Sequence, residues 1–138
     1  MKIKKNEKTN KRFTSWKFPV FNKKNITRWN WMCQYHKHLV LGKNTDIGAF
    51  TYINAKYGVY IGKDVQIGSH CSIYSESTID EKTGKVVIED GARIGTHSTI
   101  MPGVHIGKEA IIGAYSFVKR NIPAHSVAYG IPARIAKP

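Results

Sequence analysis

The stretch of sequence that decides the fold is Ile94-Gly-Thr-His-Ser-Thr-Ile100-Met-Pro-Gly-Val-His-Ile106-Gly-Lys-Glu-Ala-Ile-Ile112-Gly-Ala-Tyr-Ser-Phe-Val118. An aliphatic residue stands at every sixth position, and most of these residues are followed by Gly. A period of six fits neither an α-helix nor a simple alternating strand. It fits a triangular coil in which each side consists of one short strand and one turn.

The same spacing extends toward the N-terminus, which gives thirteen hexads if two extra residues precede Ile61 and three precede Ile88. The further aliphatic positions are Leu41, Ile47, Ile53, Ile61, Ile67, Ile73, Ile79 and Ile88. Small residues follow four positions later, at Thr45, Thr51, Cys71, Ser77, Ala92, Ser98, Ala110 and Ser116. We expect the aliphatic residues to fill the interior of the coil. The small residues should lie where the backbone of the wall passes close to that interior. Three hexads make one coil, so an all-β, parallel β-helix of a little over four coils is predicted.

The two ends of the chain depart from this period. Pro123 and Pro132 cannot donate hydrogen bonds to a strand ladder, so the C-terminal residues are expected to cap the open last coil. The predicted organisation is a leader over residues 1–40, whose first part is disordered, a β-helix over 41–122 and a cap over 123–138. The excess residues at 80–85 are expected to project as a loop.

Composition and charge limit the other possibilities. The chain has 138 residues, 41% of them hydrophobic, with 12 Gly and a net charge of +13. A thin coil buries little apolar surface, so self-association is expected. Cys33 and Cys71 offer no disulfide framework and no metal-ligand spacing. No apolar run reaches the roughly 20 residues of a membrane span, and the basic start lacks the apolar core of a signal peptide, so a cytoplasmic protein is expected.

The positive charge is concentrated in the leader, where residues 1–28 hold ten Lys or Arg and one acid, Glu7. Together with its Trp and Phe residues, this segment has three interpretations. It is a peripheral membrane contact, a nucleic-acid contact without a base-reading motif, or a cap on the first coil with a solvated Lys tail. We favour the cap and expect no nucleic-acid partner.

The segment quoted above, together with Lys119-Arg120-Asn-Ile-Pro123 and Gly130-Ile-Pro-Ala-Arg134, resembles the hexapeptide-repeat acyltransferases. The similar branch contains galactoside, maltose and xenobiotic acetyltransferases and sugar acetyltransferases of surface polysaccharides. The resemblance covers roughly residues 41–138. It implies a left-handed coil, a homotrimer with active sites in the clefts between neighbouring coils, and acetyl-CoA as co-substrate.

The resemblance also implies that His97 is the general base that deprotonates the acceptor, a role worth typically 10²–10⁴ in rate. The alternative is an exposed histidine on the outside of a turn. If the hexads beginning at Ile53, Ile73, Ile94 and Ile112 stack on one side, Glu76 lies one coil beneath His97 and stabilises the imidazolium. The alternative for Glu76 is a surface ion pair with Lys56.

The resemblance also suggests which residues bind acyl-CoA and the acceptor. Gly95, Gly113, Ala114 and Ser116 are expected to form the wall along which the pantetheine arm lies. Lys119, Arg120, Arg134 and Lys137 are expected to meet the CoA phosphates, unless they are only solvated charges. Asn54 is a candidate ligand of the sugar, although Asn is also a common turn residue.

The predicted function is therefore acetyl transfer from acetyl-CoA to a hydroxyl or amine of a sugar, or of a nucleotide-linked sugar, in surface polysaccharide synthesis. No metal is expected. One rival is a non-catalytic β-helix scaffold. A second rival is a γ-type carbonic anhydrase, which needs a zinc site with two histidines five positions apart in one coil. His97 and His105 are eight apart, so this rival lacks its ligand pattern.

Overall fold

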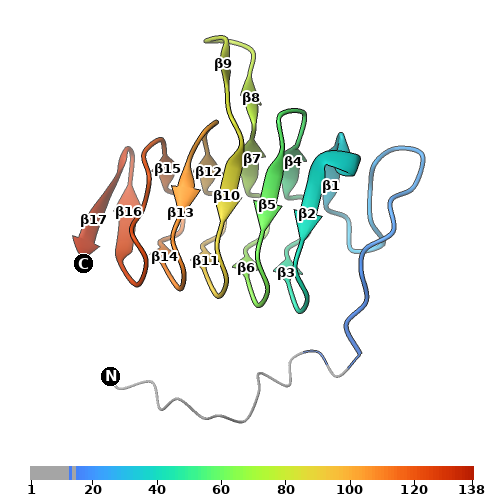
Figure 1. The fold of residues 1–138 in the computed structure, drawn as a ribbon, viewed down its shortest axis with the longest axis horizontal. Helices are drawn as coiled ribbons and strands as arrows, with labels where there is room; N and C mark the ends of the chain where they lie inside the picture. Colours follow the sequence, from blue (N-terminus) through green and yellow to red (C-terminus); the bar gives the residue numbers. More distant parts are fainter. Residues whose placement is uncertain (1–12, 14) are drawn as a thin grey trace.

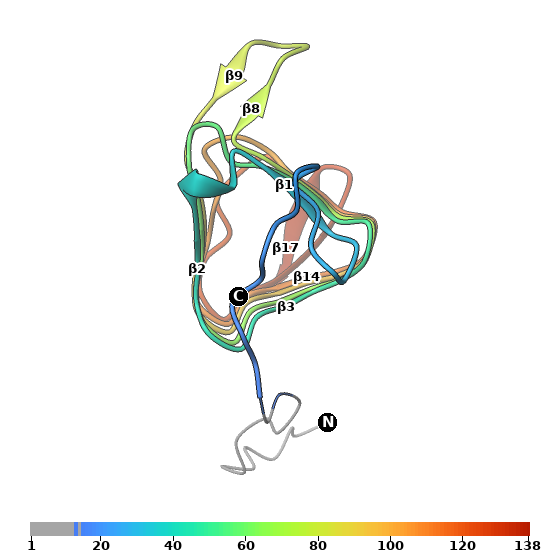
Figure 2. The ribbon, with the colours of Figure 1, turned by 90° about the vertical axis from the view of Figure 1, so that its right-hand side faces the viewer.

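The computed structural model describes Phe13 and residues 15–138, and these form a left-handed parallel β-helix. Viewed from the side, successive coils stand beside one another, and viewed along the axis they superpose into a triangle (Figures 1 and 2). Within the described residues the one helix is a short 3₁₀ turn, η1 (His36–His38). None of the described helices is long and apolar enough to cross a membrane. The predicted all-β fold is confirmed.

Each side of the triangle is one sheet. Sheet A contains β1 (Met32–Gln34), β4 (Tyr52–Asn54), β7 (Ser72–Tyr74), β12 (Thr99–Ile100) and β15 (Phe117–Val118). Sheet B contains β2 (Leu39–Leu41), β5 (Val59–Ile61), β10 (Val86–Ile88) and β13 (His105–Ile106). Sheet C contains β3 (Asp46–Ile47), β6 (Gln66–Ile67), β11 (Arg93–Ile94), β14 (Ile111–Ile112), β16 (Val127–Gly130) and β17 (Ala133–Lys137). Within these three sheets neighbouring strands pair in parallel, apart from β16 with β17.

The bore is filled by the predicted aliphatic column. Ile53, Ile73 and Ile100 pair successively in sheet A and are completely buried. Most of the predicted small residues are buried beside them, where the backbone passes close to the core and leaves little room for a side chain. The hydrophobic core is therefore one continuous column along the axis.

The register predicted after Ile73 is wrong. Ile79 is 96% exposed and lies in a projecting hairpin made of β8 (Glu76–Ser77) and β9 (Lys82–Thr83), seen at the top of Figures 1 and 2. Ile73 pairs with Ile100, which lies 27 residues later, nine more than a regular coil of 18. The insertion therefore has nine residues, and the predicted stacking of Ile53 and Ile73 with Ile94 and Ile112 does not occur.

The predicted boundaries of the β-helix are also displaced. β1 pairs with β4, and Cys33 fills the bore position that aliphatic residues occupy in later coils. The solenoid thus starts before Leu41. At the other end, β16 continues sheet C with Ala128 fully buried, and the antiparallel strand β17 closes it. The cap is this β16–β17 hairpin.

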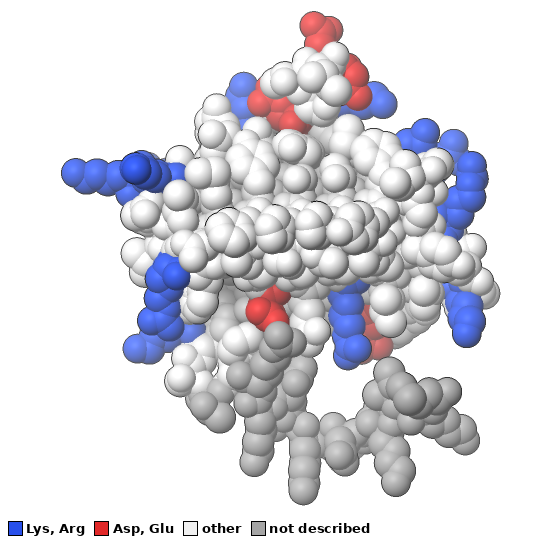
Figure 3. All heavy atoms as spheres, turned by 180° about the vertical axis from the view of Figure 1, so that it is seen from behind, with Lys and Arg blue, Asp and Glu red and all other residues white. Residues whose placement is uncertain are grey.

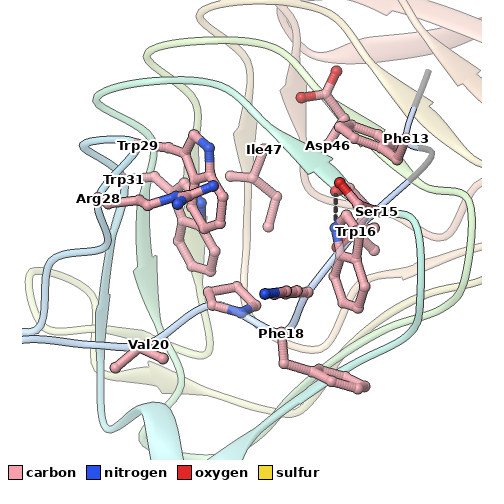
Figure 4. A pocket seen from close by; sticks show the side chains of 13 residues that line it. Phe13, Ser15, Trp16, Phe18, Val20, Arg28, Trp29, Trp31, Asp46 and Ile47 are labelled. Carbon is pink, nitrogen blue, oxygen red and sulfur yellow. Dashed lines mark hydrogen bonds between the residues drawn. The ribbon is translucent and has the colours of Figure 1, made fainter.

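The described part of the leader packs on the first coil, as the cap interpretation predicts. Trp16 Nε1 donates a hydrogen bond of 2.9 Å to the carbonyl of Thr45, and Phe21 lies edge-on to the buried Trp31. Between leader and coil lies a cavity of about 440 Å³, lined by aromatic residues and Arg28 (Figure 4). The disorder predicted for the start of the leader concerns residues 1–12, which lie outside the described part.

Candidate active site

One turn position, at the corner where sheet C leads into sheet A, carries a ring in four successive coils. These residues are Phe50, His70, His97 and Tyr115, and we call them the corner column. All four have positive φ, between 55° and 64°, which is uncommon for residues other than Gly. The coil holds this geometry through its backbone, since His97 N donates to Ser69 O (3.1 Å) and Tyr115 N donates to Thr96 O (2.9 Å).

The ring of His97 is enclosed between two others in this column. The centroids of His70 and His97 are 4.8 Å apart with 5° between the planes, and the same values describe His97 and Tyr115. This separation equals the strand spacing of a sheet, so it follows directly from the stacking of coils. The plane of the His97 imidazole is therefore fixed on both faces, while the residue itself is exposed at its edge.

The two ring nitrogens of His97 differ in their surroundings. Nδ1 lies 2.9 Å from Oγ1 of Thr96. For Nε2, the described part of the chain provides no hydrogen-bond partner. One nitrogen is therefore held by the protein, and the other is open to a ligand.

Glu76 does not lie beneath His97, so the predicted pairing within one chain is wrong. Its Oε1 is 3.3 Å from Nζ of Lys56, which is the alternative ion pair. The hydrogen bond to Glu76 and its negative charge raise the pKa of Lys56. The error comes from the register. Because the insertion has nine residues, His97 lies at the corner before the strands of sheet A, whereas Glu76 lies after a strand of that sheet.

Asn54, the predicted sugar ligand, also lies at the far end of sheet A from the corner column. Its Oδ1 accepts hydrogen bonds from the backbone N–H of Lys56 (3.1 Å) and from Ser75 Oγ (3.4 Å). This is the turn role that Asn often takes. Within one chain, the described structure shows no interaction that joins Asn54 to His97.

The predicted CoA wall is a region of close backbone contact. A Cβ on Gly95 would stand 2.5 Å from the backbone nitrogen of Ala114, so no larger residue fits there. Ser116 is buried, and its hydroxyl donates to Gly113 O (2.6 Å) and accepts from Gly130 N (3.1 Å). The Ser116 side chain thus supports the wall and is not open to a ligand.

Three of the four predicted phosphate-binding residues come together. Lys119, Arg120 and Arg134 line a small hollow of about 60 Å³ with Pro132 and Ala133. Lys137 lies near the end of β17 and does not line it. Figure 3, the view from behind sheet B, shows basic side chains at both ends of the molecule and a central band without charged side chains.

The two thiols are unsuited to nucleophilic catalysis. Burial raises the pKa of Cys33 to about 12 and also raises the pKa of Cys71. Because the thiolate is the reactive form, both remain protonated and inert at neutral pH. His97 is therefore the better candidate for the chemistry at this corner.

His70 and Thr96 are functional candidates that the sequence pattern alone did not indicate. Stacking the hexads that begin at Ile53, Ile73, Ile94 and Ile112, as a three-residue insertion implies, puts His70 on a different side of the coil from His97. The signal that reveals it is the 27-residue separation of His70 and His97, equal to the separation of Ile73 and Ile100. His105 and His125 lie elsewhere, 3.3 Å from Glu89 and 3.1 Å from Glu109 respectively.

The chain resembles known hexapeptide-repeat proteins both in sequence and in structure. The model of the bacterial transferase hexapeptide (six repeats) matches residues 85–120. Over this segment the chain is similar to the bacterial hexapeptide-repeat transferases. It is 32% identical over 111 residues to a galactoside O-acetyltransferase of Lactococcus lactis, covering 70% of this chain and 54% of that protein.

Two further similar proteins are named for an amino-sugar acceptor and for bound acetyl coenzyme A. A dTDP-3-amino-3,6-dideoxy-alpha-D-galactopyranose 3-N-acetyltransferase of Aneurinibacillus thermoaerophilus is 47% identical over 55 residues, covering 40% of this chain and 29% of that one. The structure of a hexapeptide-repeat acetyltransferase of Vibrio cholerae, complexed with acetyl coenzyme A, matches with a TM-score of 0.73 and 28% identity, covering 78% and 63% of the two chains. The chain spans about half the length of the first of these relatives.

Proposed function

We propose that this protein transfers an acetyl group from acetyl-CoA to a sugar, with His97 as the general base. The observation that carries the proposal is the geometry of His97, whose ring is clamped between His70 and Tyr115 while Nε2 stays open. A general base needs a fixed position and a free nitrogen within reach of the acceptor. The acetyltransferases among the relatives support the same reaction.

In the proposed reaction, Nε2 of His97 accepts the proton of the acceptor hydroxyl as its oxygen attacks the thioester carbonyl. The new C–O bond forms a tetrahedral intermediate, and the C–S bond then breaks. The CoA thiolate leaves and takes the proton from the imidazolium, which restores neutral His97. Such a base contributes typically 10²–10⁴ to the rate.

The acceptor class follows from this need for a base. A sugar hydroxyl is a weak nucleophile near neutral pH, whereas an amine attacks with less help. The presence of His97 therefore favours a hydroxyl as the acceptor group. A nucleotide-linked amino sugar is the second acceptor class, since one relative is named for N-acetylation of such a molecule. We place both within the synthesis of surface polysaccharides.

The basic hollow formed by Lys119, Arg120 and Arg134 is proposed to hold the phosphates of CoA. Guanidinium and ammonium groups form charge-assisted hydrogen bonds with phosphate. Lys119 follows Tyr115 by four residues, so the hollow is close along the chain to the corner column. The pantetheine arm would then run from the cap toward His97 along the tight wall at Gly95 and Gly113.

A trimer completes the proposed site. Asn54 lies where sheet A strands end, and His97 lies where they begin, so one copy does not bring them together. Threefold packing of triangular coils places one corner of a copy beside a different corner of the next copy. We propose that Asn54 of one subunit and His97 of its neighbour face the same acceptor.

The experiment that tests this function is a screen of acetyl-CoA turnover against free glycosides and nucleotide-linked sugars. We expect turnover with at least one sugar and its loss in His97→Ala. A protein that binds CoA but acetylates none of these acceptors, or one whose activity does not depend on His97, would contradict the proposal.

A further inference from the structure

The residue before each member of the corner column lies on the wall, and these residues also stack. They are Ala49, Ser69, Thr96 and Ala114, and the carbonyls of the first three accept hydrogen bonds from the backbone N–H groups of His70, His97 and Tyr115 respectively. Hydroxyl groups occur at the two middle positions, and alanine occurs at the outer two. The hydroxyls therefore stand at the level of His70 and His97.

Thr96 Oγ1 makes three contacts that together determine where its hydrogen lies. It is 2.8 Å from Ser69 O, 2.9 Å from His97 Nδ1 and 3.2 Å from Ser69 Oγ. A hydroxyl has one hydrogen to donate and lone pairs that accept. A carbonyl oxygen only accepts, so the short contact to Ser69 O needs the hydrogen of Thr96.

Because Thr96 donates that hydrogen to Ser69 O, its Oγ1 can accept a hydrogen bond from Nδ1–H of His97. The opposite arrangement, in which Thr96 donates to Nδ1, leaves two acceptor oxygens 2.8 Å apart with no hydrogen between them. It also has one hydrogen bond fewer, and each such bond is a net stabilising contribution. The hydrogen bond that one ring nitrogen makes sets which tautomer a histidine adopts.

We infer that Thr96 is a positioning residue that holds His97 as the Nδ1–H tautomer, and thereby makes Nε2 the basic nitrogen. This inference rests on the proposed function for its role in catalysis, while the tautomer itself is a property of the free protein. After Nε2 accepts a proton, Nδ1–H still donates to Thr96. The same hydrogen bond therefore serves the neutral and the charged ring, and the ring need not turn during the reaction.

The direct test is ¹⁵N NMR of the imidazoles, because the two neutral tautomers differ in their nitrogen shifts. The His97 signals are assigned by their loss in His97→Gln. We expect Nδ1–H in the wild-type protein at a pH where the ring is neutral. In Thr96→Val we expect a shift toward the Nε2–H form, which neutral histidine favours in water, and Thr96→Ser should restore Nδ1–H.

Thr51→Val is the matched control. The Thr51 hydroxyl also donates to a wall carbonyl, that of Gly68 at 2.8 Å, but it contacts no imidazole. Its loss should destabilise the coil and leave the His97 tautomer unchanged. The inference is overturned if wild-type His97 is Nε2–H, if Thr96→Val leaves the spectrum unchanged, or if Thr51→Val shifts it equally.

Kinetics separate this inference from the proposed function. Thr96→Val should lower kcat toward a hydroxyl acceptor roughly tenfold, the effect of about one hydrogen bond on the base, with the acetyl-CoA KM unchanged. Thr96→Ser should recover most of that loss. If His97→Ala keeps full activity, the base role fails while the NMR result stands. If His97→Ala is inactive and Thr96→Val keeps full kcat, the positioning role of Thr96 fails.

Discussion

The imidazoles of His70 and His97 lie parallel, with centroids 4.8 Å apart and 5° between their planes. Neighbouring coils place them there, since both occupy the same turn position with positive φ. On its other face His97 meets Tyr115 at the same distance. The candidate base is therefore held by the fold itself, through rings that the repeat brings into contact.

Replacing His70 tests this clamp. His70→Ala removes one of the two rings that enclose His97 and should lower kcat by roughly three- to tenfold through loss of orientation. His70→Phe keeps a flat ring, and the column already contains Phe50, so it should retain most of the activity. Equal losses in the two variants would contradict a stacking role.

The basic hollow makes a prediction about acetyl-CoA. Arg134→Ala or Lys119→Ala should raise the acetyl-CoA KM roughly tenfold and spare the acceptor KM, because an ionic hydrogen bond to phosphate is lost. The wild-type KM should also rise with ionic strength. Lys82→Ala, in the exposed hairpin, is the control and should leave both constants unchanged. Equal rises in both KM values for Arg134→Ala would indicate a disturbed cap instead.

The shared site predicts complementation between subunits. Asn54→Ala and His97→Ala should each be nearly inactive as pure trimers. Co-expression of the two variants should recover activity, because some sites then combine an intact His97 with an intact Asn54 from its neighbour. Sedimentation should show a trimer at micromolar concentration. A monomer with full activity, or no recovery in mixed trimers, contradicts the arrangement.

The buried thiol predicts a pH dependence of stability. Burial raises the pKa of Cys33 to about 12, whereas an exposed cysteine titrates near 8.5. Between these values the unfolded chain loses a proton that the folded chain keeps, so the free energy of unfolding falls as the pH rises. Urea unfolding at pH 8 and pH 10.5 should show a larger decline for the wild type than for Cys33→Ala. Equal declines would show that Cys33 is accessible in the folded state.

Much of the fold was predictable because the bore admits one aliphatic residue per side, and this rule is visible along the chain. The register was not, because Ile79 continues the spacing of six while standing exposed on the hairpin. An aliphatic residue at the expected position does not reveal whether it faces the bore. His97 was identified as a candidate through its motif, but His70 and Thr96 depend on the register and emerge only from the stacked coils.

The most direct measurement of the central claim is the turnover of His97→Ala with the sugar acceptor found in the screen. We predict a folded protein of unchanged oligomeric state, an acetyl-CoA KM close to that of the wild type and a kcat lower by 10²–10⁴. Toward an amine acceptor the loss should be smaller, since an amine needs less help from a base. Wild-type kcat toward the hydroxyl acceptor in folded His97→Ala would contradict the claim that His97 is the general base.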